Sequence, residues 1–410
     1  MGYINMKKFN KDKYLKKLRF KKYKRYLYIG IPCILVLLIG IYFAYSKFSV
    51  FKEEEVVRTT VGDFISGDDV IGAYIDGEYS KSIPGKNDGY VVDKIVCDND
   101  ATASWNNDSW GIVLTNLTKK TKCNVYFETK KPSLNEAVTT AMSNNPSMFA
   151  SDDADKNVRY IGKDPSNYVY FNCSDYNNPT ADTCELWRII GVFNNVTKSD
   201  GTKENLVKII RDESIGDIAW ADNNVNDWST ATLQQNLNSR TYYTTTLKND
   251  TTRNVIEEVV WNLDGTGDFT SARNGLASDF YGNERGTIVH TGWTGKIGLM
   301  YPSDYGYATS GGTTKDRVAC LAKELYNWDS SDFSDCKGND YLYNSSLYQW
   351  TLAPGLVPAG TVFYVSRGGG VTNINASDAN AVRPALFLKF NIQVDKGTGA
   401  KSDPYILKMQ

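Results

Sequence analysis

The longest apolar run of the chain lies near its N-terminus. From Tyr26 to Tyr45 the sequence reads YLYIGIPCILVLLIGIYFAY, twenty residues without a formal charge. A helix of about 20 apolar residues is long enough to cross a hydrocarbon core roughly 30 Å thick. Tyrosines lie near both ends of the run, where aromatic belts form in membranes. The pattern predicts a transmembrane signal-anchor over residues 26–45, followed by a stalk over residues 46–60.

Two other interpretations of this run stay open. A buried core helix would also be apolar, but Gly30, Pro32 and Gly40 are costly in a soluble helix and tolerated in a membrane helix. A cleavable signal peptide has an apolar region of about 7–15 residues, which is shorter than this run. The small residues around Ala44-Tyr45-Ser46 still permit cleavage. The length favours an anchor that is not cleaved.

Beyond the stalk, short alternating runs separated by turn signals predict strands. YVVDKIVC alternates as a half-buried strand does, and WGIVLTNL and KCNVYFE supply further runs. Asp76-Gly77 separates AYI from EYSKSI and is a two-residue hairpin signal. Because no strong helical period occurs here, residues 61–130 predict a small all-β module that resembles a sandwich.

A helical linker is expected after this module, over residues 131–157. Ser133 followed by Glu136 is a capping box. It predicts a short helix over LNEAVTTAM. The polar stretch at 144–157 then predicts a hinge or a loop.

Residues 158–410 alternate between strand-like and helix-like patterns. NYVYFN, LWRIIGVF and NLVKIIRD are β-prone, and the turn at 198–201 predicts that the last two form a hairpin. Helical patterns follow in TATLQQNLN, TTRNVIEEVVWNL and RVACLAKELYNW, and strand-like runs return in GTVFYVS, AVRPALFLKF and PYILK. Strands, then helices, then strands predict an α+β domain. We expect long surface loops at 305–314 and 366–372.

Charge is distributed unevenly along the chain, although the formal net charge is only −1. Residues 1–27 carry eleven basic side chains and one acidic side chain, whereas residues 48–410 carry a net −12. The basic flank predicts that the tail over residues 1–25 is cytoplasmic and that the chain after the anchor is extracytoplasmic. The membrane is therefore an expected partner. An acidic outer part argues against a nucleic-acid partner, which needs a basic footprint.

Six of the seven cysteines lie on the predicted outer side, and Cys33 lies in the anchor as a membrane-buried thiol. An oxidising exterior permits disulfides. Metal or redox chemistry is the alternative, but no C-x-x-C occurs and the one histidine, His290, lacks a clear ligand partner. On spacing alone, we expect three local disulfides: Cys97 with Cys123, Cys173 with Cys184, and Cys320 with Cys336.

Several runs, taken in order, carry a resemblance to known proteins. YIGKDPSNYVYFNC, ELWRIIGVF, VKIIRDESIGDIAW, NDWSTATLQQNLN, KIGLMYPSDYGYA, YQWTLAP and AVRPALFLK resemble a family of uncharacterised, membrane-anchored surface proteins of Firmicutes-type bacteria over residues 155–410. WRIIGV and the closing SRGGG…AVRPALFL more distantly resemble C-type-lectin-like and formylglycine-generating-enzyme-like folds. That resemblance implies a compact α+β unit with long loops and a ligand-binding face.

The chain departs from those folds at their functional motifs. The Trp-Asn-Asp calcium motif is absent, because Asn226-Asp227-Trp228 has these residue types in another order. The oxidase cysteine pair of formylglycine-generating enzymes is not recognisable either. The resemblance therefore concerns fold more than function. We expect no cofactor, with Ca²⁺ as the open alternative where aspartates gather, at 152–155 and at 264–268.

Aromatic residues favour binding over catalysis. The chain has 9 tryptophans and 27 tyrosines, and aromatic faces stack on sugars or fill protein hot spots, although strand propensity explains most of them. The stretch 301–307 is rich in Gly and Pro, so we expect it to be exposed beside a ligand. The candidate ligand-binding residues are Trp293, Tyr301, Asp304, Tyr305, Tyr307 and Trp350.

No catalytic constellation is evident in the sequence. Glu257 and Glu258 are adjacent on a predicted helix and point in different directions, and a lone His290 is more often packed or solvated than catalytic. We assign no catalytic and no metal-binding residues. We predict a cell-surface ligand-binding or adhesion protein that recognises glycan or protein. An extracytoplasmic enzyme acting on envelope or host glycans is the alternative.

Overall fold

The computed structural model describes residues 70–98, 101–115, 121–263, 275–285, 292–355 and 359–409, together with Lys16. The chain divides into two compact units, Met1–Lys130 and Lys131–Gln410. In the described parts of the chain, no helix combines the length and the apolar character that crossing a bilayer requires. The predicted anchor at 26–45 and the stalk at 46–60 lie outside the described residues.

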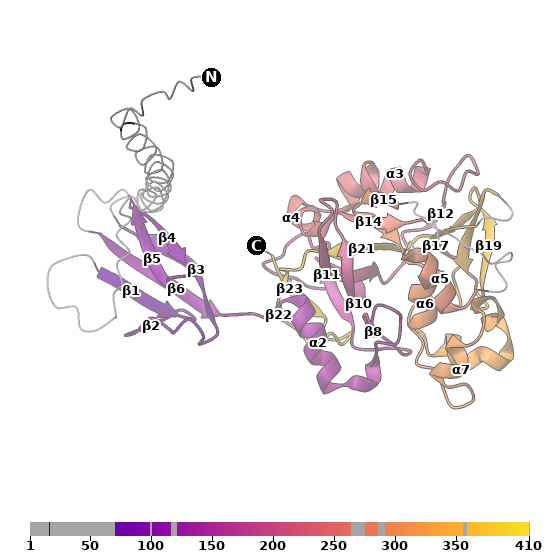
Figure 1. Ribbon diagram of the computed structural model, residues 1–410, viewed down its shortest axis with the longest axis horizontal. Helices are drawn as coiled ribbons and strands as arrows, with labels where there is room; N and C mark the ends of the chain where they lie inside the picture. The colour runs from indigo at the N-terminus through magenta and orange to yellow at the C-terminus, as the bar shows by residue number, and fades with distance from the viewer. Residues whose placement is uncertain are drawn as a thin grey trace, which may run out of the picture. The chain divides into compact units, whose positions relative to one another are not determined.

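The described part of the smaller unit between residues 70 and 130 consists of strands and turns (Figure 1). Four strands form one sheet in the order β2-β1-β6-β3, with β1 parallel to β6, and β4 pairs with β5. Their bounds are β1 Val70–Ile75, β2 Glu78–Ser80, β3 Tyr90–Cys97, β4 Thr102–Asn106, β5 Gly111–Thr115 and β6 Lys122–Thr129. The predicted all-β character of this module is confirmed for these residues.

An aromatic group holds the β4–β5 ribbon against the sheet. The ring of Trp105 meets the rings of Trp110 and Phe127 edge-on, at centroid distances of 5.3 Å in both cases. Asp76 and Gly77 have φ angles of 49° and 89°, which is the backbone that a two-residue hairpin turn needs. The predicted hairpin is confirmed, because β1 and β2 pair across this turn.

The larger unit is built on a ten-stranded sheet in which β10 and β11 are central (Figure 1). Its path is β13-β21-β11-β10-β9-β23-β22, with β16 paired to β21 and with β8 joining β7 to β10. The predicted hairpin of β10 and β11 is confirmed. The bounds are β7 Phe149–Ala150, β8 Val158–Tyr160, β9 Tyr168–Phe171, β10 Glu185–Thr197, β11 Lys203–Arg211, β13 Ile256–Glu257, β16 Ile297–Leu299, β21 Pro384–Leu388, β22 Gln393–Lys396 and β23 Tyr405–Lys408.

A second sheet, a ribbon and short helices complete the larger unit. The five-stranded sheet has the order β12-β20-β17-β18-β19, with β12 Asp217–Ala219, β17 Gln349–Pro354, β18 Thr361–Val365, β19 Val371–Asn375 and β20 Ala379–Ala381. The ribbon pairs β14 Val259–Asn262 with β15 Gly292–Gly295. The helices are α2 Leu134–Asn144, η1 Pro146–Met148, α3 Thr232–Asn238, η2 Tyr242–Thr246, α4 Asp250–Asn254, α5 Ala277–Glu284, α6 Pro302–Tyr307, α7 Arg317–Leu321, η4 Leu325–Asp329, η5 Ser331–Phe333 and α8 Ser334–Gly338. The predicted α+β character is confirmed, with strands dominating.

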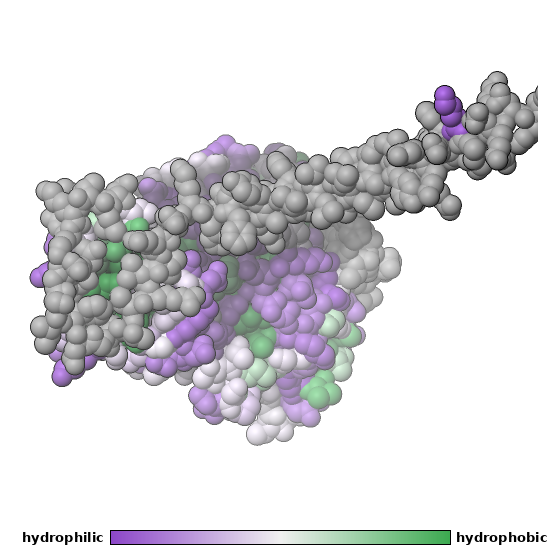
Figure 2. Space-filling view, turned by 60° about the vertical axis from the view of Figure 1, so that its left-hand side comes forward, coloured by the Kyte–Doolittle hydropathy of each residue, from purple (hydrophilic) through white to green (hydrophobic). Residues whose placement is uncertain are grey.

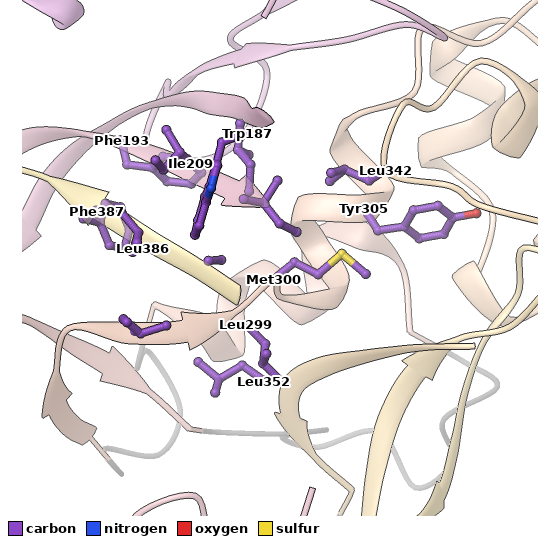
Figure 3. Close-up of a cluster of buried hydrophobic side chains, with 14 of the residues drawn as sticks. Trp187, Phe193, Ile209, Leu299, Met300, Tyr305, Leu342, Leu352, Leu386 and Phe387 are labelled. Atoms are coloured by element: carbon purple, nitrogen blue, oxygen red, sulfur yellow. The ribbon is translucent and has the colours of Figure 1, made fainter. Parts of the chain in front are cut away.

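The core of the larger unit lies where the sheets and helices meet (Figure 3). Side chains of β10, β11 and β21 meet those that follow β16, among them Trp187, Ile209, Leu386 and Met300, which are at most 1% exposed. Layers cover both faces of β10 and β11, so these strands have continuous apolar runs instead of alternation. Six of the nine tryptophans are fully buried, which explains most of the aromatic content by packing.

Two predicted elements were wrong. TTRNVIEEVVWNL forms α4, β13 and β14 in place of one helix, because its β-branched residues pair with β21 and β15. The stretch at 305–314 is mostly buried and includes the end of α6, so it is not a long surface loop. The capping box of Ser133 and Glu136 is confirmed at the start of α2.

Candidate functional site

A cavity of about 420 Å³ opens in the larger unit. Its walls come from β10, β11, β14, β21, α5 and α6, together with Asp155, Arg285 and Tyr301 from the connections. The aromatic side chains along it are Phe193, Trp261, Tyr281, Tyr301 and Phe387. The size lies within the range of small-ligand sites in proteins, roughly 300–1,000 Å³.

Five buried charged side chains lie in and directly behind the floor of this cavity, and we call them the charge cluster: Asp153, Arg159, Lys208, Glu284 and Asp304. Lys208 Nζ lies 2.5 Å from Asp304 Oδ2. Arg159 Nη1 donates to Asp304 Oδ1 at 3.1 Å, and Arg159 Nε donates to Asp153 Oδ2 at 2.6 Å. Glu284 accepts hydrogen bonds from the hydroxyl and the backbone N–H of Ser303. Asp304 thus joins the two cations.

Burial shifts the pKa values in the charge cluster. Burial, and then the nearby Asp304 carboxylate, raise the pKa of Glu284 from 4.5 to about 8. Burial also lowers the pKa of the Lys208 ammonium, although Asp304 opposes this shift. Burial raises the pKa of Asp304 as well, but Lys208 and Arg159 outweigh it and hold the pKa below its usual range. With Glu284 protonated, the cluster contains two cations and two anions and is neutral.

Local structure explains how three of the five charged residues reach the cluster. Lys208 lies in the middle of β11, where five consecutive residues are buried, so its side chain cannot reach solvent. Asp304 is the third residue of α6 and accepts from the backbone N–H of Tyr301, as a capping carboxylate does. Glu284 is the last residue of α5. Three separate elements therefore bring their side chains to one place.

The rim of the cavity is polar and accessible. Arg285 and Lys203 are exposed there, and Arg285 Nε pairs with Asp155 Oδ2 at 2.6 Å. Asn194 and Asn195 lie in the second irregularity of β10, between Phe193 and Val196. Tyr301 is partly exposed, and its hydroxyl donates to the backbone oxygen of Asn262 at 3.0 Å. The rim therefore offers a ring face, amides and charges of both signs.

The six predicted ligand-binding residues do not form one site. Tyr301 and Asp304 line the cavity. Tyr305 is fully buried and donates to the backbone oxygen of Gly369 at 2.7 Å, and Tyr307 is 5% exposed against the Arg159 guanidinium. The predicted exposure of 301–307 was wrong, because a proline at the first helical position and a capping aspartate turn this segment into a buried helix.

The other two candidates lie elsewhere in the core. Trp350 is 1% exposed and donates from Nε1 to the backbone oxygen of Ile218 at 2.9 Å. Trp293 is partly buried and meets Trp228 edge-on at a centroid distance of 6.1 Å. Both indole side chains therefore pack inside the larger unit.

On the face drawn in Figure 2, hydrophilic residues dominate among the coloured residues, and hydrophobic ones form small separate groups. The indole side chains therefore serve packing more than ligand contact.

Sequence reasoning missed Arg159, Lys208 and Glu284. One signal was available: the run NLVKIIRD places a lysine in the interior of a strongly apolar strand, and a lysine is almost never fully buried unless it is paired. The partner of that lysine lies 96 residues away. No spacing in the sequence points to it.

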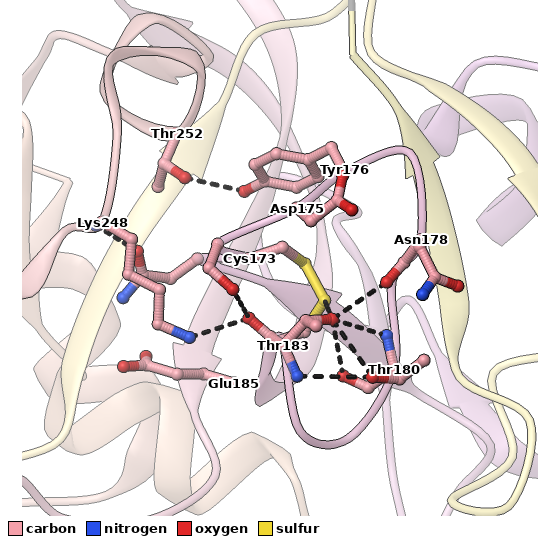
Figure 4. Close-up of a disulfide and its surroundings, with 12 residues drawn as sticks. Cys173, Asp175, Tyr176, Asn178, Thr180, Thr183, Glu185, Lys248 and Thr252 are labelled. Carbon is pink, nitrogen blue, oxygen red and sulfur yellow. Dashed lines mark hydrogen bonds between the residues drawn. A yellow bond between two sulfur atoms is a disulfide. The ribbon is translucent and has the colours of Figure 1, made fainter.

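The three expected disulfides are present: Cys97–Cys123, Cys173–Cys184 and Cys320–Cys336. Figure 4 shows Cys173–Cys184 closing a loop in which Thr183 accepts from Lys248 Nζ at 2.8 Å through its backbone oxygen. Each pairing predicted from spacing is confirmed.

The three aspartates at 152–155 form ion pairs with three different arginines. Asp152 pairs with Arg317, Asp153 with Arg159 and Asp155 with Arg285. Among the described residues, no group of three or more His, Cys, Asp or Glu side chains is arranged to hold a metal ion. The segment 264–268 and His290 lie outside the described residues.

Comparison with protein-family models, with curated proteins and with solved structures found no match for this chain. Functional inference therefore starts from the cavity, its polar rim and the charge cluster below it. The rim can contact a ligand, whereas the charges of the floor are satisfied mainly by one another.

Proposed function

We propose that this chain is a single-pass, membrane-anchored extracytoplasmic protein that binds a ligand at the cell surface, and that the cavity of the larger unit is the binding site. The rim of the cavity is the main observation behind this proposal. It combines the partly exposed Tyr301 with the amides of Asn194 and Asn195 and with the charges of Lys203 and Arg285. Ring faces and planar polar groups suit a sugar residue. A glycan is therefore the preferred ligand, and a protein segment is the second choice.

The membrane part of this proposal comes from the sequence. The apolar run at 26–45 and the basic residues before it favour an anchor with a cytoplasmic N-terminus. The three disulfides support an extracytoplasmic location, because disulfides persist in oxidising compartments. Protease treatment of intact cells tests the orientation, and a larger unit that stays protected on intact cells would contradict it.

We also propose a C-type-lectin-like fold for the larger unit. Its mixture of sheets with short helices and long irregular connections supports this likeness. The likeness concerns architecture, and the proposed ligand site rests on the cavity itself.

An extracytoplasmic glycan-cleaving enzyme is the second candidate, and one observation favours it. Burial raises the pKa of Glu284 to about 8, so this carboxyl keeps its proton at neutral pH and can act as a general acid. Release of reducing ends from envelope glycans that stops in Glu284→Gln would support the enzyme over the binding protein.

Glycan and protein arrays probed with the full-length chain in detergent test the binding proposal. We expect saturable binding that weakens about tenfold or more in Lys203→Ala and Arg285→Ala, which corresponds to about 1.4 kcal/mol. Lys401→Ala and Arg240→Ala are matched controls, because both residues are exposed away from the cavity. Absence of any saturable ligand, or equal binding by all four variants, would contradict the proposal.

A further inference from the structure

Lys208 lies in surroundings that are unusual for an ammonium group. Its side chain is 1% exposed, and the hydrogen-bond partner that the structure gives its Nζ, among the described residues, is Asp304 Oδ2 at 2.5 Å. An ammonium has three donors, so a single acceptor leaves it poorly satisfied. Aromatic rings surround Nζ at centroid distances of 4.5 to 5.6 Å: Phe193, Trp261, Tyr301 and Phe387.

The carboxyl group of Asp304 is held in a fixed orientation in front of Lys208. Its Oδ1 accepts from Arg159 Nη1 at 3.1 Å, and its Oδ2 accepts from the backbone N–H of Tyr301 at 2.9 Å as well as from Lys208. The Arg159 guanidinium is placed where it stabilises negative charge on Oδ1. Donors held in this way stabilise the oxyanion that forms when a nucleophile adds to a carboxyl carbon.

Glu284 supplies a carboxyl group beside this pair. It interacts electrostatically with both Lys208 and Asp304, and its own hydrogen bonds go to Ser303. Burial raises its pKa to about 8, and burial lowers the pKa of Lys208. At neutral pH the site therefore contains a protonated carboxyl group, and burial makes it easier for the Lys208 ammonium to give up a proton.

We propose that Lys208 and Asp304 condense to an intramolecular isopeptide bond, with Glu284 carrying the protons. Lys208 first transfers a proton to Oδ2 of Asp304, which gives a neutral amine and a neutral carboxylic acid. Burial favours this transfer, whereas the ion pairs of Asp304 with Lys208 and Arg159 oppose it. Nζ then bonds to Cγ of Asp304, and negative charge develops on Oδ1 opposite Arg159. Glu284 delivers its proton to the Oδ2 hydroxyl, which leaves as water, and then takes one proton from the nitrogen. Glu284 ends protonated, as it began.

The reaction requires no oxidant, cofactor or partner chain. One C–N bond forms, one C–O bond breaks, and the oxygen leaves with two protons from the ammonium. Condensation replaces a buried cation and a buried anion, which are costly to desolvate, by a neutral amide. The product ties β11 to α6 across 96 positions of the chain and restricts the unfolded state.

Peptide mapping of the full-length chain by mass spectrometry, after reduction and alkylation, tests the proposal. We expect one branched peptide that joins the Lys208 and Asp304 segments and weighs one water less than the two linear peptides together. Lys208→Met and Glu284→Gln lose this peptide completely, and Lys208→Met migrates more slowly on a denaturing gel. Asp304→Asn gives the same amide by loss of ammonia in place of water.

Lys396→Met is the matched control, because Lys396 lies on β22 of the same sheet but is exposed and does not line the cavity, and it keeps the branched peptide. Linear peptides with a free Lys208 amine from wild-type chain that retains its three disulfides would overturn the proposal. A branched peptide that persists in Glu284→Gln would overturn the role of Glu284. Any misfolding of that variant shows as altered disulfide pairing, and the wild-type map then decides alone.

Discussion

Arg159 Nη1 lies 3.1 Å from Asp304 Oδ1 inside the larger unit, although 145 residues separate the two. Their side chains are 2% and 1% exposed. The pair connects β8 to α6, and Arg159 also holds Asp153 at 2.6 Å. The guanidinium lies over the rings of Phe193 and Tyr281, at 4.6 and 5.0 Å from their centroids. This arginine therefore organises both the charge cluster and the aromatic wall of the cavity.

Replacing Arg159 by Met removes the only guanidinium that the structure pairs with Asp153 among the described residues. We expect a loss of about 3–5 kcal/mol in the free energy of unfolding, because the variant leaves a buried carboxylate without its cation. Denaturant titration measures this loss. Lys323→Met, which breaks the half-exposed pair with Glu324, should cost about 1 kcal/mol or less. Similar costs for the two variants would contradict the prediction.

Stability should fall as pH rises, because of Glu284. Its pKa is about 8 in the folded chain and 4.5 as the ordinary value. Between these values the folded state holds a proton that the unfolded state has released. The contribution of Glu284 to the free energy of unfolding is complete below pH 4.5. It falls by at most about 1.4 kcal/mol per pH unit as the pH rises, and it stays constant above about pH 8.

Urea titrations from acidic to alkaline pH measure this slope. Glu284→Gln should flatten it, because the amide does not titrate. Glu324→Gln is the control, since Glu324 is largely accessible and its pKa is lowered by hydrogen bonding and by Lys323. An unchanged slope in Glu284→Gln would refute the assignment.

Removing Cys320–Cys336 with a double Ser substitution should destabilise the larger unit by about 3 kcal/mol, because the bond closes a loop of 16 positions. Thermal unfolding followed by the signal of the buried tryptophans measures the loss. Alkylation without reduction should label Cys33 and leave the other six cysteines unlabelled. Labelling at Cys97 or Cys173 in folded chain would disagree with the disulfides of the structure.

Gly191 lies where β10 meets β8, and an added Cβ would come 2.2 Å from the backbone oxygen of Val158. Gly191→Ala should therefore cost about 1–3 kcal/mol, because the strands must separate. Gly338 is the matched control, since no atom lies within 4 Å of its added Cβ. Gly338→Ala should be neutral or slightly stabilising. Equal effects of the two substitutions on the denaturant midpoint would rule out the steric explanation.

The local features of the fold were predictable from the sequence. The Asp76-Gly77 turn, the Ser133 capping box and the hairpin of β10 and β11 depend on a few consecutive residues, and the structure contains all three. The segments that were predicted wrongly depend on distant partners. TTRNVIEEVVWNL has a helical period, but pairing with β21 and β15 decides its structure. The segment 301–307 has a loop-like composition, and its burial as α6 against α5, β17 and β18 depends on elements far along the chain.

The residues of the candidate site were also predictable only in part. Asp304 and Tyr301 were identified by their position in an aromatic segment, although the reason, expected exposure, was wrong. Lys208, Arg159 and Glu284 were not identified, because a buried charge is recognised only when its partner is known. Those partners lie on α6 and β8, far along the chain.

The sequence by itself determined the uneven charge, the apolar run at 26–45, the strand-forming segments and the spacing of three cysteine couples, because these properties depend on composition and on nearby residues. Only the tertiary structure decided that Lys208, Asp304 and Glu284 share one water-poor site. Burial sets the pKa values there, and burial is a property of everything packed around a residue. The chemistry proposed for this chain depends on that packing, which no local pattern records.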